Sequence, residues 1–214
     1  DNVRMSGVIF TRSLSKGAPY YVVNYDDQSG STESITSGKS ENSKMLVIRK
    51  DRLETLTSLD INLVRLCEAA QEIEALINYD SLDIEFAITY DDEIIVLQVR
   101  PIAVDHSEFK ISDQAFYKLI NEAEKKFIEH DKKLPFLLGT SALFGLMPDW
   151  NPAEIIGTNP RKLSHDLYNY LITDNVWAES RAFLGYKKSN NPGLVSLGGK
   201  PYVDIQMSFN TFVP

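Results

Sequence analysis

Apolar and polar residues alternate with a period of two along several short segments in the first half of the chain. Four of these segments are rich in Val, Ile, Tyr or Thr and lie between turn-forming stretches: residues 6–11, 19–25, 33–37 and 45–48. Two more, 82–88 and 93–100, alternate in the same way on either side of a short polar connection, and Pro101 then ends the ladder because it has no N–H to donate. The pattern predicts an antiparallel sheet that ends in a β-hairpin.

A helical period separates the two groups of strands. Between Leu53 and Ile77 the apolar residues recur in steps of three and four, which predicts one amphipathic helix, and Cys67 lies on its apolar side as a small buried residue. Beyond residue 105 the pattern predicts helices at 112–132, 160–171 and 174–184, a Gly/Pro/Asn-rich stretch at 185–200 and a strand at 202–206. We therefore expect an α+β fold: an antiparallel sheet with a packed helix in residues 1–104, followed by a mainly helical segment in residues 105–214.

The hairpin has one polar and one apolar face. A four-residue connection pairs Ile88 with Glu93 and sets Asp83 opposite Gln98, and opposed residues share a face of a sheet. One face then carries two carboxylates, an amide and a guanidinium: Asp83, Glu85, Gln98 and Arg100. The other face is apolar and is expected to pack on the helix: Leu82, Ile84, Phe86, Ile88, Ile95, Leu97 and Val99.

The polar face has two interpretations. Carboxylate and amide oxygens suit Mg²⁺, which proteins hold through one or two carboxylates together with substrate phosphates, and an arginine beside them suits a phosphoryl group in transfer. The alternative is a solvated hairpin face on which Arg100 pairs with an acidic neighbour.

Three sequence blocks match one enzyme family in the same order. Asp83-Ile-Glu-Phe86 followed by Leu97-Gln-Val-Arg-Pro-Ile102 resembles the end of the ATP-grasp nucleotide-binding domain of phosphoenolpyruvate synthases and pyruvate phosphate dikinases. Ser6-Gly-Val-Ile-Phe-Thr-Arg12 and Gly30-Ser-Thr-Glu-Ser-Ile-Thr-Ser-Gly38 resemble two earlier blocks of that domain. The tract 147–157 resembles a segment that follows the ATP-grasp domain in a subset of synthase-like proteins.

The resemblance implies roles for individual side chains. Glu85 and Gln98 would hold Mg²⁺ on the phosphates of ATP, and Arg100 would assist phosphoryl transfer as the catalytic residue. The remaining positions would face the nucleotide: Asp83, Glu33, Arg12 and Thr11.

The resemblance also implies parts that this chain does not supply. We expect it to be the C-terminal part of an ATP-grasp domain, inactive alone, in an ATP-dependent phosphotransferase. The first ATP-grasp half, a phosphohistidine domain and a domain for pyruvate or phosphoenolpyruvate would lie elsewhere in the parent. This chain does not contain the phosphohistidine motif, because none of its histidines lies in a Gly-rich Thr-Ser-His context. These histidines, His106, His130 and His165, are expected at the surface or near helix ends. The alternatives are a non-catalytic nucleotide-sensing or scaffold module of the same fold, and a related phosphotransferase with another acceptor.

Composition and charge exclude several classes of protein. The 214 residues carry a net charge of −8, which argues against a nucleic-acid partner. A single cysteine excludes a disulfide framework and fits the cytoplasm, and no apolar run approaches the roughly 18 residues that a membrane span needs. Residues 1–104 hold 10 basic and 17 acidic side chains. We expect some of these acids to bind metal and the cations facing the phosphates to come from outside this chain.

Overall fold

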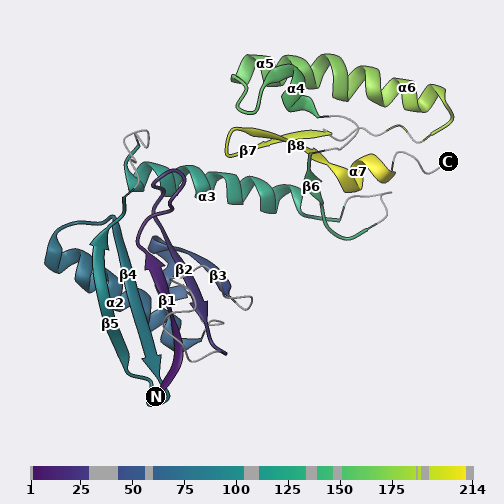
Figure 1. Cartoon of the computed structure of the whole chain (residues 1–214). Helices are drawn as coiled ribbons and strands as arrows, with labels where there is room; N and C mark the ends of the chain where they lie inside the picture. Colours follow the sequence, from purple (N-terminus) through teal and green to yellow (C-terminus); the bar gives the residue numbers. More distant parts are fainter. Residues whose placement is uncertain are drawn as a thin grey trace. The chain divides into compact units, whose positions relative to one another are not determined.

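The computed structural model describes residues 2–28, 43–55, 60–103, 111–133, 139–146, 151–186, 188 and 193–210. The chain forms two compact units, Asp1–Phe116 and Tyr117–Pro214. The first unit combines an antiparallel sheet with a packed helix (Figure 1). The predicted α+β fold class is confirmed.

Five strands of the described chain form one antiparallel sheet in the order β3-β2-β1-β4-β5. Their bounds are Val3–Phe10 for β1, Tyr20–Asp26 for β2, Lys44–Arg49 for β3, Leu82–Thr89 for β4 and Ile94–Pro101 for β5. The central strand β1 pairs with β2 on one side and β4 on the other, so it joins the first strands to the later hairpin. The predicted strands and hairpin are thus present, except that the strand expected at 33–37 lies outside the described residues.

Helix α2 (Ile61–Ile77) packs on one face of this sheet and completes its core (Figure 1). Alternate residues of the strands and the apolar stripe of the helix meet there, and the most buried of them include Ile9, Val23, Ile84, Phe86, Leu66 and Cys67. Cys67 is fully buried, as expected, and burial raises the pKa of its thiol to about 12. Helix α2 therefore covers one face of the sheet, and the polar side chains of the hairpin lie on the opposite face.

The predicted start of this helix at Leu53 is wrong. Lys50–Thr55 form a short 3₁₀-helix, η1, whose regular geometry is interrupted at Arg52, where φ is −128°. The α-helix begins at Ile61 because the Asp60 side chain accepts a hydrogen bond from the Asn62 N–H at 2.9 Å and so satisfies a first-turn donor. Leu53 is still buried in the core, although it belongs to η1 and not to the α-helix.

The second unit adds a small sheet to its helices. Its strands pair antiparallel in the order β6-β8-β7, with bounds Phe144–Gly145, Lys200–Asp204 and Leu194–Leu197. β7 lies in the Gly/Pro/Asn-rich stretch 185–200, for which no strand was predicted, and β8 ends two residues before the predicted 206 because α7 (Ile205–Asn210) begins there.

Two of the predicted helices in the second half join into one. The helices expected at 160–171 and 174–184 form a continuous run made of α5 (Lys162–Tyr168), the π-helical η2 (Asn169–Trp177) and α6 (Ala178–Phe183). His165, expected at the surface or near a helix end, lies in the last turn of α5 and is buried, one turn from the buried Tyr168. The remaining helices are α3 (Asp113–His130), close to its predicted range, and α4 (Pro152–Ile156). No helix among the described residues is long and apolar enough to cross a bilayer.

Candidate functional site

The hairpin of β4 and β5 has a different register from the predicted one. Ile88 pairs with Ile94 and not with Glu93, because the Thr89 N–H donates to the Glu93 carbonyl at 3.0 Å and closes a longer turn. A β-bulge then adds one more residue to β5, at Leu97, between the pairs on either side. The predicted opposition of Asp83 and Gln98 is therefore wrong.

The new register brings the four polar residues into two directly opposed pairs. Asp83 lies opposite Arg100, and Glu85 lies opposite Gln98. Opposed residues of an antiparallel pair share a face and have Cβ atoms about 5 Å apart, so the predicted common face is kept.

The bulge also changes which residues of β5 turn toward the core. Ile95 and Leu97, which we expected on the apolar face, are 41% and 50% exposed. Val99 packs against the core as expected, and Ile94 does so in place of Ile95. Because the extra residue at the bulge shifts the alternation by one, the predicted inward set is correct on β4 but only partly correct on β5.

Arg100 joins the two carboxylates of this face. Its Nε donates to Asp83 Oδ2 at 2.8 Å, and its Nη2 lies 3.5 Å from Glu85 Oε1. The hydrogen bond to Asp83 raises the pKa of the guanidinium. Half of the Arg100 side chain is exposed, and Asp83 Oδ1 is buried without a hydrogen-bond partner among the described residues. The site thus offers a ligand the exposed guanidinium of Arg100, next to the Asp83 oxygen that accepts no hydrogen bond from the part of the chain that the structure describes.

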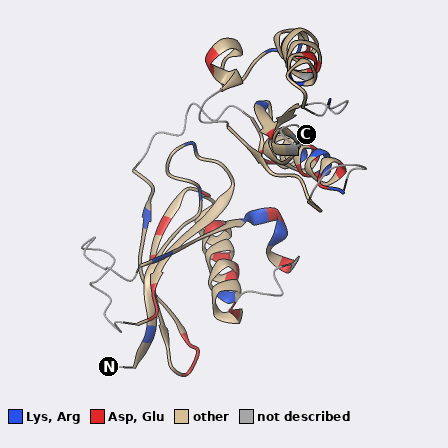
Figure 2. Ribbon diagram, turned by 90° about the vertical axis from the view of Figure 1, so that its right-hand side faces the viewer, with Lys and Arg blue, Asp and Glu red and all other residues tan. Residues whose placement is uncertain are grey.

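On the neighbouring strands this face carries mainly apolar residues beside Asp83 and Glu85, interrupted by Asn24, which lies opposite Val8. Phe10 and Val22 continue the row of Asp83, and Val8 lies opposite Glu85. On β3, Met45 and Val47 extend these two rows and are 70% and 51% exposed. Acidic positions lie along the strands and on α2 (Figure 2). A ligand on this face would therefore meet oxygen ligands at one side and an apolar surface at the other.

The donors on β4 and β5 are oxygen atoms, which suit hard metal ions. Glu85 and Gln98 offer two oxygen donors from adjacent strands, which is the number that Mg²⁺ takes from protein when phosphates and water supply the rest. No group of three or more His, Cys, Asp or Glu residues that would enclose an ion exists among the described residues. The chemistry suits a hard cation that arrives with its ligand rather than a closed structural metal site.

Thr11 and Arg12 lie at the same end of the sheet, directly after Phe10, which pairs with Asp83. Thr11 is fully buried; its hydroxyl donates to the Asp80 carbonyl at 2.8 Å and accepts from the Leu82 N–H at 2.7 Å. The structure thus brings six of the seven predicted site residues to neighbouring positions. Glu33, the seventh, lies outside the described residues.

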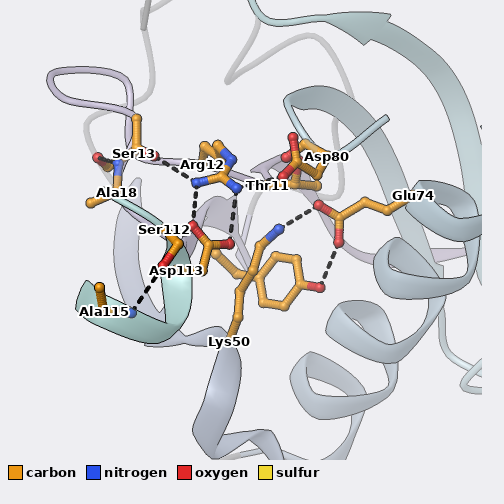
Figure 3. A network of polar contacts seen from close by, with 12 residues as sticks. Thr11, Arg12, Ser13, Ala18, Lys50, Glu74, Asp80, Ser112, Asp113 and Ala115 are labelled. Carbon is orange, nitrogen blue, oxygen red and sulfur yellow. Dashed lines mark hydrogen bonds and ion pairs between the residues drawn. The ribbon is translucent and has the colours of Figure 1, made fainter. Parts of the chain in front are cut away.

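Arg12 is the centre of a network of ion pairs (Figure 3). It donates to both carboxylate oxygens of Asp113, at 3.0 and 2.9 Å, and to Asp80. Burial disfavours the charged guanidinium, but the hydrogen bonds to Asp80 and Asp113 outweigh it and raise the pKa of Arg12. In return, Arg12 holds the pKa of Asp80 below its usual range.

Sequence reasoning missed the lysine beside this network. Lys50 pairs with Glu74 and lies over the ring of Tyr21, 4.8 Å from its centroid, while the Tyr21 hydroxyl donates to Glu74 at 2.9 Å. Burial lowers the pKa of Lys50 although Glu74 opposes the shift. No local signal marks these residues, because Glu74 lies on the polar side of a helical pattern and the partners are 24 and 53 residues away.

Comparisons with protein-family models, curated proteins and solved structures found no match for this chain. The resemblance to the phosphoenolpyruvate synthase family therefore stays a prediction that depends on the three sequence blocks.

Proposed function

We propose that this chain provides the metal-facing side of the nucleotide site in a phosphoenolpyruvate-synthase-like phosphotransferase. Such an enzyme would transfer phosphoryl from Mg–ATP to a histidine outside this chain. One observation carries the proposal: Asp83 and Glu85 lie directly opposite Arg100 and Gln98 on the sheet face that α2 does not cover. This arrangement gathers carboxylates, an amide and a guanidinium at the end of a hairpin that the core anchors.

Each side chain has a task that its position supports. Glu85 and Gln98 would hold Mg²⁺, whose charge offsets that of the phosphates when it is bound. Arg100, half exposed and adjacent to both acids, would bind the phosphoryl oxygens and stabilise the charge that develops on them. Asp83 would keep the guanidinium in place through the 2.8 Å hydrogen bond to Nε.

The apolar strip supports a nucleotide as the ligand. Phe10, Val22 and Val47 lie in the row that continues from Asp83, so a base stacked there would reach the polar pairs with its phosphates. The hairpin site itself has two carboxylates against one guanidinium, which repels a polyphosphate. The proposal therefore requires cations from residues outside this chain, and we expect the isolated chain to bind Mg–ATP weakly or not at all.

The test uses Arg100→Ala and Glu93→Gln in the full-length protein with labelled ATP and Mg²⁺. Glu93 is exposed at the turn of the same hairpin, away from the two pairs, so its variant controls for a charge change. We expect Arg100→Ala to lose phosphohistidine formation by about a hundredfold or more while it keeps ATP binding, and Glu93→Gln to behave as the wild type.

Three results would each contradict a part of the proposal. Unchanged phosphohistidine formation in Arg100→Ala would remove the transfer role. Binding of ATP without any phosphohistidine in the wild-type protein would favour the nucleotide-sensing module. Sub-micromolar affinity of the isolated chain for Mg–ATP, measured by calorimetry, would remove the requirement for outside cations.

A further inference from the structure

The four terminal N–H groups of Arg12 all donate to protein oxygens. Nη1 donates to the Gly17 carbonyl at 2.9 Å and to Asp113 Oδ1 at 3.0 Å, and Nη2 donates to Asp113 Oδ2 at 2.9 Å and to Asp80 Oδ2. These bonds use the four terminal N–H groups of an arginine, and only 13% of the side chain is exposed. We propose that Arg12 is a positioning residue that couples the first turn of α3 to the segment leading into Asp83.

The Asp80 side of this contact leads directly to the candidate site. Asp80 lies two residues before β4 and three before Asp83. The backbone of this segment is held by Thr11, whose hydroxyl bridges the Asp80 carbonyl and the Leu82 N–H, while Arg12 holds the Asp80 side chain. Two consecutive residues that directly follow β1 therefore set where β4 begins, and with it the position of Asp83 opposite Arg100.

The Asp113 side leads to helix α3. Asp113 is the first residue of the helix, and Ser112 caps the turn by accepting from the Ala115 N–H at 3.3 Å. Phe116, in the same turn, packs edge-to-face on Tyr20 with ring centroids 5.8 Å apart. Arg12 and Tyr20 thus hold the first turn of α3 from the two ends of the β1–β2 connection. The Asp113 carboxylate binds Arg12 through both oxygens, the geometry that fixes orientation best.

The charges around Arg12 favour this role over direct contact with a phosphate. Arg12 and Lys50 are the cations of the cluster, and they face Glu74, Asp80 and Asp113 (Figure 3). Three carboxylates against two cations leave no positive excess that would attract an anion. Because a single guanidinium holds both Asp80 and Asp113, release of the first turn of α3 loosens the anchor of β4, and the reverse holds as well.

Two backbone amides report the two sides of the coupling. The Phe116 N–H donates to the Ser112 carbonyl within the first turn of α3, and the Leu82 N–H donates to Thr11 Oγ1 at the start of β4. Their exchange with deuterium, followed by NMR on the whole chain, measures the opening of each side separately. This experiment needs no ligand, so its outcome is independent of the proposed function.

The variants remove either partner of Arg12. Asp113→Asn should speed exchange about fivefold at Phe116 and also at Leu82, and Asp80→Asn should do the same at both amides, because a coupling free energy is reciprocal. Arg12→Lys should have an intermediate effect, since it keeps the charge and loses the paired bonds. The control Glu122→Gln removes one exposed carboxylate from the same helix and should leave both amides unchanged.

A merely local role for each contact gives a different result. If Asp113→Asn speeds exchange at Phe116 alone, or Asp80→Asn at Leu82 alone, the coupling does not exist and the proposal is overturned. An equal effect of Glu122→Gln would reassign the change to net charge and would overturn it too. Asp80 and Asp113 are 58% and 36% exposed, so their amide variants retain the fold, and unchanged exchange within β2 verifies this.

Discussion

Gly7 lies in the central strand β1, between β2 and β4, and Gly7→Ala tests how tightly the sheet is packed there. It sits in β1 opposite Tyr25 of β2 and Phe86 of β4. A Cβ at this position would overlap the Asn24 carbonyl oxygen and lie 2.9 Å from Tyr25 Cα and 3.0 Å from Phe86 Cζ. Two of these three atoms belong to backbone, so a rotamer change cannot relieve the contact.

Two opposing effects decide whether Gly7→Ala raises or lowers the free energy of unfolding. Alanine restricts the unfolded chain more than glycine does, which by itself stabilises the fold by about 0.4–1 kcal/mol. Overpacking costs about 1–3 kcal/mol, and two weakened ladder hydrogen bonds cost about 1 kcal/mol each. We therefore expect Gly7→Ala to lower the free energy of unfolding by roughly 2–4 kcal/mol, equivalent to a Tm decrease of roughly 10–25 °C for a unit of this size.

Urea unfolding followed by hydrogen exchange of peptides from β1, β2 and β4 measures this loss in the first unit alone. Gly145→Ala is the matched control, because the added Cβ approaches only the flexible end of Ile205, with Cδ1 at 2.7 Å. Phe86→Leu in the Gly7→Ala background separates the two kinds of contact. A gain in stability, or full rescue by Phe86→Leu, would refute the assignment of the clash to the β2 backbone.

Two further predictions concern titratable groups. Arg12 holds the pKa of Asp80 below its usual range, with Lys50 contributing in the same direction, so the pair stabilises the fold above about pH 4 and loses this contribution as the pH falls through the folded pKa. The difference in unfolding free energy between wild type and Asp80→Asn should therefore shrink as the pH is lowered from about 6 through the folded pKa of Asp80; a constant difference would contradict the ion pair. Because burial raises the pKa of Cys67 to about 12, iodoacetamide at about pH 8 should label it only at the rate of unfolding, and rapid labelling of the native protein would show that the core opens locally.

Local periodicity was sufficient to predict the elements that form the candidate site. The period of two on β4 gave the inward residues Ile84 and Phe86 and the outward residues Asp83 and Glu85, because one side of the sheet is buried and the other is not. The same reasoning placed Cys67 in the core. These predictions succeed where a single face must be apolar.

The parts that were not predicted depend on contacts between distant residues or on single backbone angles. No residue type near Leu97 indicates that a β-bulge lies there. The register of β5 cannot be derived unless the bulge is known. The ion pair of Arg12 and Asp113 joins positions 101 residues apart, so the sequence around either residue does not predict its partner. The start of α2 was missed for a different reason. Asp60 is a residue type that commonly caps a helix, but the helical spacing of apolar residues continues before it, and we placed the helix start by that spacing.

The bulge at Leu97 divides the hairpin into two stretches of ladder with separate registers. In an uninterrupted hairpin, one residue added to the turn moves every pair, and the polar side chains at the far end change faces. Here the turn at 90–93 and the pairs that hold Asp83 and Glu85 lie on opposite sides of an irregularity that already accommodates one surplus residue. The turn is thus insulated from the site, and related sequences can vary its length while the order Asp-x-Glu on β4 and Gln-x-Arg on β5 keeps its geometry.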